Sequence, residues 1–274
     1  MAYKTILLNI NIDSDAQPLI SAAVDLAKQH DAKLIGHCSV CADLYLPATH
    51  GEALILAAKV RDRILDDLDR SSRQIQAAFD QLSTGHVKAE WRRTFGDPSQ
   101  AVVELSRTAD LIVMPAPEAA SSSKAHRSAL PGDVVLRSGR PLVLLAEGAK
   151  RFAAKKIVIA WKDTREARRA ISDAIPILTL ADEIIIVTVT SAVRRSDRES
   201  MEDVRAFLGG HGINAELKFV ESSDEYIGLM DFIDGSFPDL VVSGAYGHTR
   251  LREWVFGGIT RTLLASSINR FMSY

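Results

Sequence analysis

The 274-residue sequence contains two copies of one pattern of strands and helices. The segment 4–11 (Lys-Thr-Ile-Leu-Leu-Asn-Ile-Asn) resembles the segment 155–162 (Lys-Lys-Ile-Val-Ile-Ala-Trp-Lys), and both are short apolar runs between polar residues. Such runs are typical of strands that are buried on both faces of a parallel sheet. A repeat of this length predicts two similar domains in tandem, which a chain of this size also favours.

Later parts of the two copies match as well. The segment 109–114 (Ala-Asp-Leu-Ile-Val-Met) corresponds to 238–243 (Pro-Asp-Leu-Val-Val-Ser). The offset between the copies is 151 residues at the first strand and 129 at the fourth, so the first copy has 22 extra residues, net. We expect these in the region 41–81 as a loop and a long amphipathic helix, where the second copy has a shorter helix at about 196–208.

Strands and helices alternate in each copy. Residues 16–30 carry apolar side chains at the i, i+3, i+4, i+7 spacing of a helix, and 164–180 follow the first strand of the second copy in the same way. This alternation predicts parallel sheets with right-handed crossovers and helices on both faces. The predicted fold class is therefore α/β, with two tandem doubly wound, Rossmann-like domains that each contain a five-stranded parallel sheet.

We place the domain boundary near 148–151, which gives domains of residues 1–148 and 152–274. A linker this short keeps the two domains adjacent. We expect them to pack as a pseudo-twofold pair within the chain, imitating a homodimer, with the last strands 141–145 and 270–274 at or near the contact. A further homodimer of the whole chain stays open.

The charge balance narrows the range of partners. The 33 basic and 35 acidic residues give a net charge of -2, which argues against a nucleic acid or a membrane surface as the main partner. No apolar run approaches the ~20 residues of a membrane span, and the first residues do not resemble a signal peptide. Two cysteines give no disulfide framework. We expect a soluble, cytoplasmic protein.

A glycine pattern follows the fourth strand of the second copy, where ligands bind in doubly wound sheets. Gly244, Gly247 and Gly257 are spaced as Gly-x2-Gly-x9-Gly, and a helix-like run begins at Ile259. Glycine lets backbone N–H groups approach an anion, and the start of a helix favours negative charge. Thr260 would add a hydroxyl donor. The alternative is that these glycines only shape a surface loop and cap a helix.

This glycine pattern resembles the nucleotide motif of the universal stress protein family. The resemblance covers essentially the whole chain as two copies and is strongest in the second. It implies a fold like that of the adenine nucleotide alpha hydrolases and an ATP site at the ends of the strands. By resemblance, the phosphates would contact Gly244, Gly247, His248, Gly257, Gly258, Ile259 and Thr260. The adenine and ribose would contact Ala160, Trp161, Lys162 and Val189.

Two residues depart from the family pattern. Lys162 stands where the family commonly has an acidic residue, and Gly258 replaces the usual hydroxyl or amide residue. Loss of the carboxylate removes a sugar or metal contact, so we expect ATP with or without Mg²⁺ and assign no metal ligand in the protein. Lys162 would meet a phosphate or point to solvent. The ring of Trp161 would stack near a base or pack at the end of its strand.

The first copy has lost the glycine pattern. An alignment without a gap, from Pro115 to Pro141 against 244–270, puts Pro115, Glu118 and Ser128 at the three glycine positions. Proline removes a backbone donor, and Glu118 would repel a phosphate. We therefore expect no nucleotide site of this type in the first copy, which would act as a scaffold.

The sequence contains few signs of a metal site or of a catalytic motif. Cys38 and Cys41 form a lone Cys-x-x-Cys pair, whereas a structural zinc site needs four ligands, so we interpret both as small strand-end or core residues. The sequence contains none of the motifs Gly-x4-Gly-Lys-Ser/Thr, Gly-x-Gly-x-x-Gly, His-Glu-x-x-His or Gly-x-Ser-x-Gly. We nominate no catalytic residue.

Three functional hypotheses remain at this stage. The leading one is a non-enzymatic stress-response protein that binds an adenine nucleotide in its second domain. The second is an ATPase or adenylate-handling enzyme of the same fold. The third is a tandem domain without a ligand that acts through protein contacts. Fold alone does not decide among them.

Overall fold

The computed structural model describes residues 2–41, 52–117, 127–146, 148–149, 151–245 and 268–274. The strands of the first copy are β1 (Thr5–Asn9), β2 (Lys33–Val40), β3 (Ala89–Phe95), β4 (Leu111–Pro115) and β5 (Leu142–Leu145). Those of the second copy are β6 (Lys156–Ala160), β7 (Glu183–Thr190), β8 (Glu216–Glu221), β9 (Leu240–Gly244) and β10 (Asn269–Ser273). Together these strands form one sheet in the order β3-β2-β1-β4-β5-β10-β9-β6-β7-β8.

The strand order confirms two tandem doubly wound copies. All pairings within each copy are parallel, and the copies have the same order, with the first strand between the second and the fourth. The copies meet where β5 pairs antiparallel with β10, in a register that sets Leu142 opposite Met272. The predicted contact between the last strands is therefore confirmed, and it joins the two copies into one continuous sheet. The register is symmetric about Val143 and Phe271, as a pseudo-twofold arrangement of the copies requires.

Helices cover both faces of this sheet. The first copy has α1 (Ala16–His30), α2 (Glu52–Ser83), α3 (Pro98–Leu105), the short 3-10 helix η1 (Ser106–Thr108) and α4 (Pro131–Ser138). The second copy has α5 (Arg165–Leu178), α6 (Arg195–Gly210) and α7 (Glu225–Ser236), and the helix expected from Ile259 lies outside the described residues. Buried residues of α1 and α5 belong to one apolar cluster that runs under both copies. The predicted domain boundary falls in the segment between β5 and β6.

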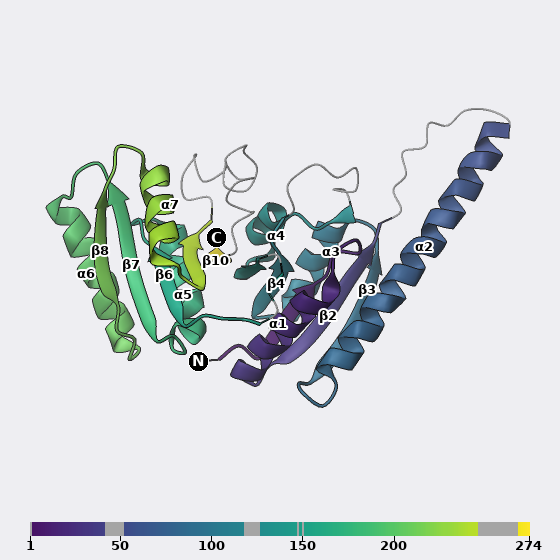
Figure 1. Ribbon diagram of the computed structural model, residues 1–274, viewed down its shortest axis with the longest axis horizontal. Coiled ribbons are helices and arrows are strands. Elements are labelled where there is room, and N and C mark those ends of the chain that lie inside the picture. Colours follow the sequence, from purple (N-terminus) through teal and green to yellow (C-terminus); the bar gives the residue numbers. More distant parts are fainter. Residues whose placement is uncertain (1, 42–51, 118–126, 147, 150, 246–267) are drawn as a thin grey trace.

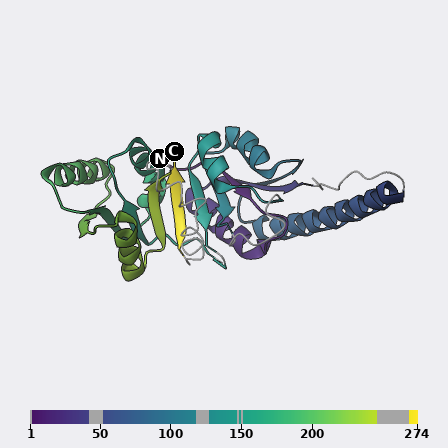
Figure 2. The same ribbon diagram turned by 90° about the horizontal axis from the view of Figure 1, so that it is seen from above.

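The extra residues of the first copy lengthen one helix, as expected. Helix α2 has 32 residues, whereas its counterpart α6 has 16. Its C-terminal half buries Leu68, Ile75 and Phe79. Its N-terminal turns extend well beyond the end of the sheet (Figures 1 and 2).

One aspartate in each copy fixes the start of the first strand. Asp110 accepts hydrogen bonds from the two backbone N–H groups of residues 4 and 5, at 2.7 and 2.9 Å. Asp239 does the same for residues 155 and 156, at 2.9 Å each. The matching aspartates of the repeat thus have the same structural role, because each accepts hydrogen bonds from backbone N–H groups that have no partner in the sheet.

The strand registers correct the gap-free alignment of the two glycine regions. Ile112 pairs with Leu142 in the first copy, and its counterpart Val241 pairs with Arg270 in the second. The intervening segment is therefore one residue shorter in the second copy. The counterpart of Gly257 is Ser128 or the next residue, alanine, so no glycine occupies that position under either alignment.

Candidate functional site

The carboxyl ends of β6, β7 and β9 meet at one edge of the second copy. Ala160 ends β6 and lies in register with Val187 on β7 and Ser243 on β9. Five of the predicted site residues lie at this edge within the described residues: Ala160, Trp161, Lys162, Val189 and Gly244. The others lie outside the described residues: Gly247, His248, Gly257, Gly258, Ile259 and Thr260.

Gly244 is the first glycine of the motif, and it is buried under the start of α5. A Cβ atom on Gly244 would lie 2.6 Å from the backbone nitrogen of Ala167 and 2.6 Å from the carbonyl carbon of Glu166. Thr164 caps this helix by accepting a hydrogen bond from the Ala167 N–H at 3.2 Å, which fixes the first turn in place. Packing of α5 against β9 therefore requires glycine here, for a reason separate from any ligand.

Trp161 packs into the core and does not face the edge. Its indole Nε1 donates to the Ser200 hydroxyl on α6 at 3.0 Å, and only 6% of the residue is exposed. Its backbone N–H donates to the carbonyl of Val187, and its carbonyl accepts from the Thr188 hydroxyl. Of the two interpretations left open for the ring, the structure shows packing.

Ala160 and Val189 offer small apolar groups at the ends of β6 and β7. Val189 is partly buried and packs against Gly228, in the first turn of α7. A Cβ atom on Gly228 would lie 2.8 Å from a methyl carbon of Val189 and 2.7 Å from the side chain of Ser222, so glycine is needed for this close approach. The side chain of Val189 is therefore partly covered by α7.

The ammonium group of Lys162 has a partner on a neighbouring helix. Its Nζ lies 2.6 Å from Oε2 of Glu225, the first residue of α7. Their side chains are 45% and 53% exposed, and an ion pair this exposed contributes only about 0–1 kcal/mol to stability. A second exposed pair lies close by in the chain, where Nε of Arg168 donates to Asp163 at 2.8 Å.

The corresponding edge of the first copy contains a buried polar network that the sequence analysis missed. Nδ1 of His37 lies 2.9 Å from the side-chain oxygen of Asn9, and Nε2 lies 2.8 Å from the Thr94 hydroxyl. Because the amide oxygen can only accept, Nδ1 carries the proton and Nε2 accepts from Thr94. Burial lowers the pKa of His37 to about 4, so the ring is neutral at physiological pH.

The second copy carries apolar residues at the same places. The strand registers match Asn9, His37 and Thr94 to residues 160, 187 and 220, which are alanine, valine and valine. A comparison of the two copies strand by strand would have revealed this difference. The two edges therefore differ in chemistry as well as in their glycines.

An ion pair also lies at the edge of the first copy. Nε of Arg127, just before α4, lies 3.3 Å from Oδ2 of Asp13, just before α1. Ser128 is half-buried beside it, Pro115 ends β4, and Glu118 lies outside the described residues.

The two cysteines are buried free thiols. Burial raises the pKa of Cys38 in β2 to about 12, which leaves it protonated and unreactive. Across the described ranges, no group of three or more His, Cys, Asp and Glu side chains is arranged to hold a metal ion.

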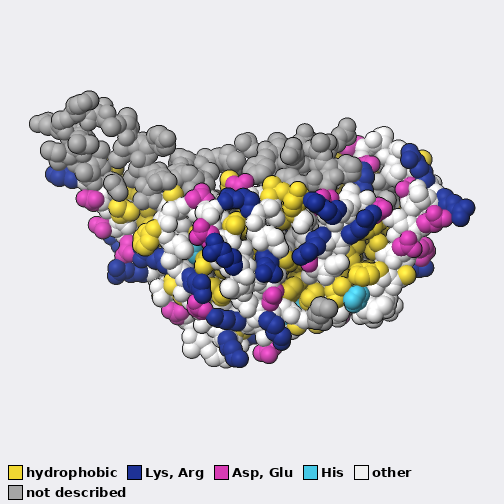
Figure 3. Space-filling view, turned by 180° about the vertical axis from the view of Figure 1, so that it is seen from behind, with side chains coloured by type: hydrophobic (Ala, Val, Ile, Leu, Met, Phe, Trp, Pro, Cys, Tyr) yellow, Lys and Arg dark blue, Asp and Glu magenta, His cyan; other side chains and the backbone are white. Residues whose placement is uncertain are grey.

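Basic and acidic side chains are interspersed over both halves of the face in Figure 3, in keeping with the balanced charge of the sequence. None of the helices in the described part of the chain has the length and hydropathy needed to span a bilayer.

The whole chain is similar in structure to universal stress proteins. A universal stress protein from Archaeoglobus fulgidus DSM 4304 has a TM-score of 0.66 and 16% identity, with 98% of this chain and 95% of that chain covered. A putative universal stress protein from Pseudomonas aeruginosa UCBPP-PA14 has a TM-score of 0.57 and 17% identity, with 99% and 93% covered. A functionally unknown protein from Pseudomonas aeruginosa PAO1 has a TM-score of 0.56 and 15% identity, with 99% and 92% covered.

No protein-family model matches the sequence, and no curated protein matches it. The chain thus has the tandem fold of universal stress proteins, over its full length, and the resemblance drawn from the sequence is confirmed for the fold.

Proposed function

We propose that this chain is a stress-response protein of the universal stress protein type, which binds ATP at the carboxyl edge of its second copy. The observation that carries the proposal is the position of the glycine pattern. It begins at Gly244, the last residue of β9, directly beside the ends of β6 and β10. In doubly wound sheets this edge is where ligands bind.

In this proposal the described residues at this edge contact the adenine nucleotide. Ala160 and Val189 would contact the base, and Lys162, at the same edge, would supply a cation. Trp161 is held in the core at the end of β6 by its hydrogen bond to Ser200. When bound, the nucleotide would supply a phosphate chain that the glycine segment is suited to hold by backbone N–H groups.

In this proposal the first copy is a partner within the chain. At its edge lie the Asn9–His37–Thr94 network and the Arg127–Asp13 ion pair, in place of the glycine pattern of the second copy. The protein acts by binding and carries out no rapid chemistry. Direct assay of ATP turnover tests this last point, and hydrolysis at an enzymatic rate would contradict it.

The main test is calorimetric titration with ATP, which should give about one site per chain. Gly257→Asp adds bulk and negative charge at the helix start expected there, so it should weaken binding more than tenfold. Ser128→Asp makes the same change in the first copy and should leave affinity unaltered. Two equal sites, or unchanged affinity in a folded Gly257→Asp protein, would reject the assignment.

A further inference from the structure

We propose that Lys162 is an anion-binding side chain of the second copy and that it exchanges Glu225 for a phosphate oxygen when a nucleotide binds. This inference rests on the proposed function, because it assigns a role within the same site. The exchange breaks one ion pair and forms another, with no change in protonation.

The position of Lys162 places it near Gly244, the first glycine of the pattern. It follows Ala160 by two residues, and Ala160 is in register with Ser243, the neighbour of Gly244. The backbone of Lys162 therefore lies at the same end of adjacent strands as the first motif glycine. Its ammonium group is turned toward α7, where Glu225 accepts from it at 2.6 Å.

The ion pair between Lys162 and Glu225 can break at little cost in free energy. Both side chains are about half exposed, so neither loses a buried environment when the contact breaks. A lysine ammonium has three donors on a flexible four-carbon stem, so it can turn from one anion to another within a few ångströms. A phosphate oxygen is an equivalent acceptor for it.

The surrounding charges give Lys162 a second effect on affinity. Among the described residues, the carboxylates at this edge include Asp163, Glu166, Asp224 and Glu225. Glu166 is paired with Arg165 at 3.1 Å. Asp163 is paired with Arg168, and Asp224 accepts from two backbone N–H groups at the start of α7. Glu225 relies on Lys162 as its cation partner, so loss of the lysine would both remove a donor and leave a carboxylate facing the phosphates.

The test compares ATP with adenosine, which lacks phosphate, by calorimetry at fixed ionic strength. Lys162→Ala should weaken ATP binding at least tenfold, equivalent to 1.4 kcal/mol, and change adenosine binding less than twofold. Glu225→Gln should tighten ATP binding several-fold, because it removes the competing carboxylate, and should also leave adenosine unchanged. Lys162→Gln keeps most of the stem and serves in place of the alanine variant if that protein does not fold.

Lys155→Ala is the matched control. Lys155 forms an ion pair of similar kind with Asp182 at 3.2 Å, at the opposite end of the strands. Its loss should leave both affinities unchanged. If wild-type protein binds ATP but neither Lys162→Ala nor Glu225→Gln changes that affinity, the inference fails and the proposed function stands. If wild-type protein binds neither ATP nor adenosine, the proposed function fails with it.

Discussion

At the scale of single residues, a comparison of the two copies shows which buried polar groups the fold requires. A buried polar network is costly unless every member is paired, and the second copy shows that this fold does not need one. Asn9 is 1% exposed and His37 is completely buried, yet each has a partner. The network is thus a specific feature of the first copy and not a requirement of the sheet.

Replacement of His37 by valine, the residue found in the second copy, should destabilise the protein by about 1–3 kcal/mol. The cause is that Asn9 and Thr94 would each lose a partner while they stay buried or half-buried. The triple variant Asn9→Ala, His37→Val, Thr94→Val installs the apolar set of the second copy and should regain part of this loss. Urea denaturation gives the free energy of unfolding of the wild-type protein, the His37→Val variant and the triple variant. A triple variant less stable than His37→Val alone would contradict this account.

The same histidine predicts a pH dependence of stability. The pKa of His37 is about 4 in the folded protein and about 6.5 in an unfolded chain, so the unfolded state binds more protons between these values. Its contribution is fully present above pH 6.5 and is lost as the pH falls toward 4, by about 3 kcal/mol in all. The triple variant should show a correspondingly smaller loss in denaturation curves between pH 7 and 4. His30 remains in both proteins, where burial also lowers its pKa to about 4, so the comparison isolates His37.

At the scale of secondary-structure elements, the contact of α5 with β9 links the candidate site to the core. Gly244→Ala would push a methyl group into the backbone of Glu166 and Ala167, so α5 must shift. We expect a loss of about 1–3 kcal/mol in the free energy of unfolding, measured without nucleotide. Gly209→Ala is the control, because an added Cβ in the last turns of α6 meets no atom within 4 Å. That change should leave stability equal or slightly higher. Equal stability of both variants would show that Gly244 is not a packing glycine.

The sequence predicts the elements well because their signals are local. Helix α1 spans 16–30 as expected, since Asp15 caps its start and the apolar spacing runs to its end. Asp110 and Asp239 allowed the fourth strands of the two copies to be matched, because each accepts hydrogen bonds from the backbone at the start of the first strand of its copy. The repeat then predicted two copies of one doubly wound arrangement of strands, and the two copies of the structure do share one strand order.

The partners of the site residues could not be predicted in this way. Trp161 donates to Ser200, 39 residues further along the chain, and Lys162 donates to Glu225, 63 residues further along. Such pairs depend on the angles at which helices cross the sheet, and hydrophobic periodicity carries no information about them. His37 and Thr94, 57 residues apart, meet because β2 and β3 are paired strands, and hydrophobic periodicity does not give the register of that pairing.

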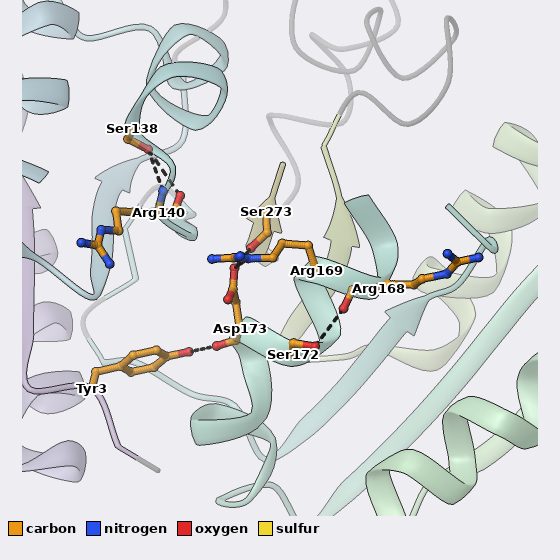
Figure 4. A network of polar contacts seen from close by, with 8 residues as sticks. All are labelled: Tyr3, Ser138, Arg140, Arg168, Arg169, Ser172, Asp173 and Ser273. Atoms are coloured by element: carbon orange, nitrogen blue, oxygen red, sulfur yellow. Dashed lines mark hydrogen bonds and ion pairs between the residues drawn. The ribbon is translucent and has the colours of Figure 1, made fainter. Parts of the chain in front are cut away.

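At the scale of the whole molecule, the junction between the copies is held by more than strand pairing. The Tyr3 hydroxyl, from the first copy, donates to the backbone carbonyl of Asp173 on α5 at 2.6 Å (Figure 4). The carboxylate of Asp173 accepts from Ser273 on β10 at 3.0 Å and pairs with Arg169 at 2.8 Å. Both ends of the described chain therefore meet on one helix of the second copy. Burial is the main reason that the pKa of Tyr3 is raised, which keeps its hydroxyl protonated as a donor.

The last prediction is that the two copies do not persist as separate stable monomers. Expression of residues 1–148 and 152–274 apart would expose β5 and β10, whose apolar side chains and free backbone groups favour pairing with another strand. Each half should self-associate, and a mixture should form a one-to-one complex in analytical ultracentrifugation. The intact chain should unfold in one cooperative transition by calorimetry, and Tyr3→Phe should lower its stability by about 1 kcal/mol through loss of the bond to Asp173. Two monomeric halves that unfold independently, each as stable as the intact chain, would show that the continuous sheet is not a unit of folding.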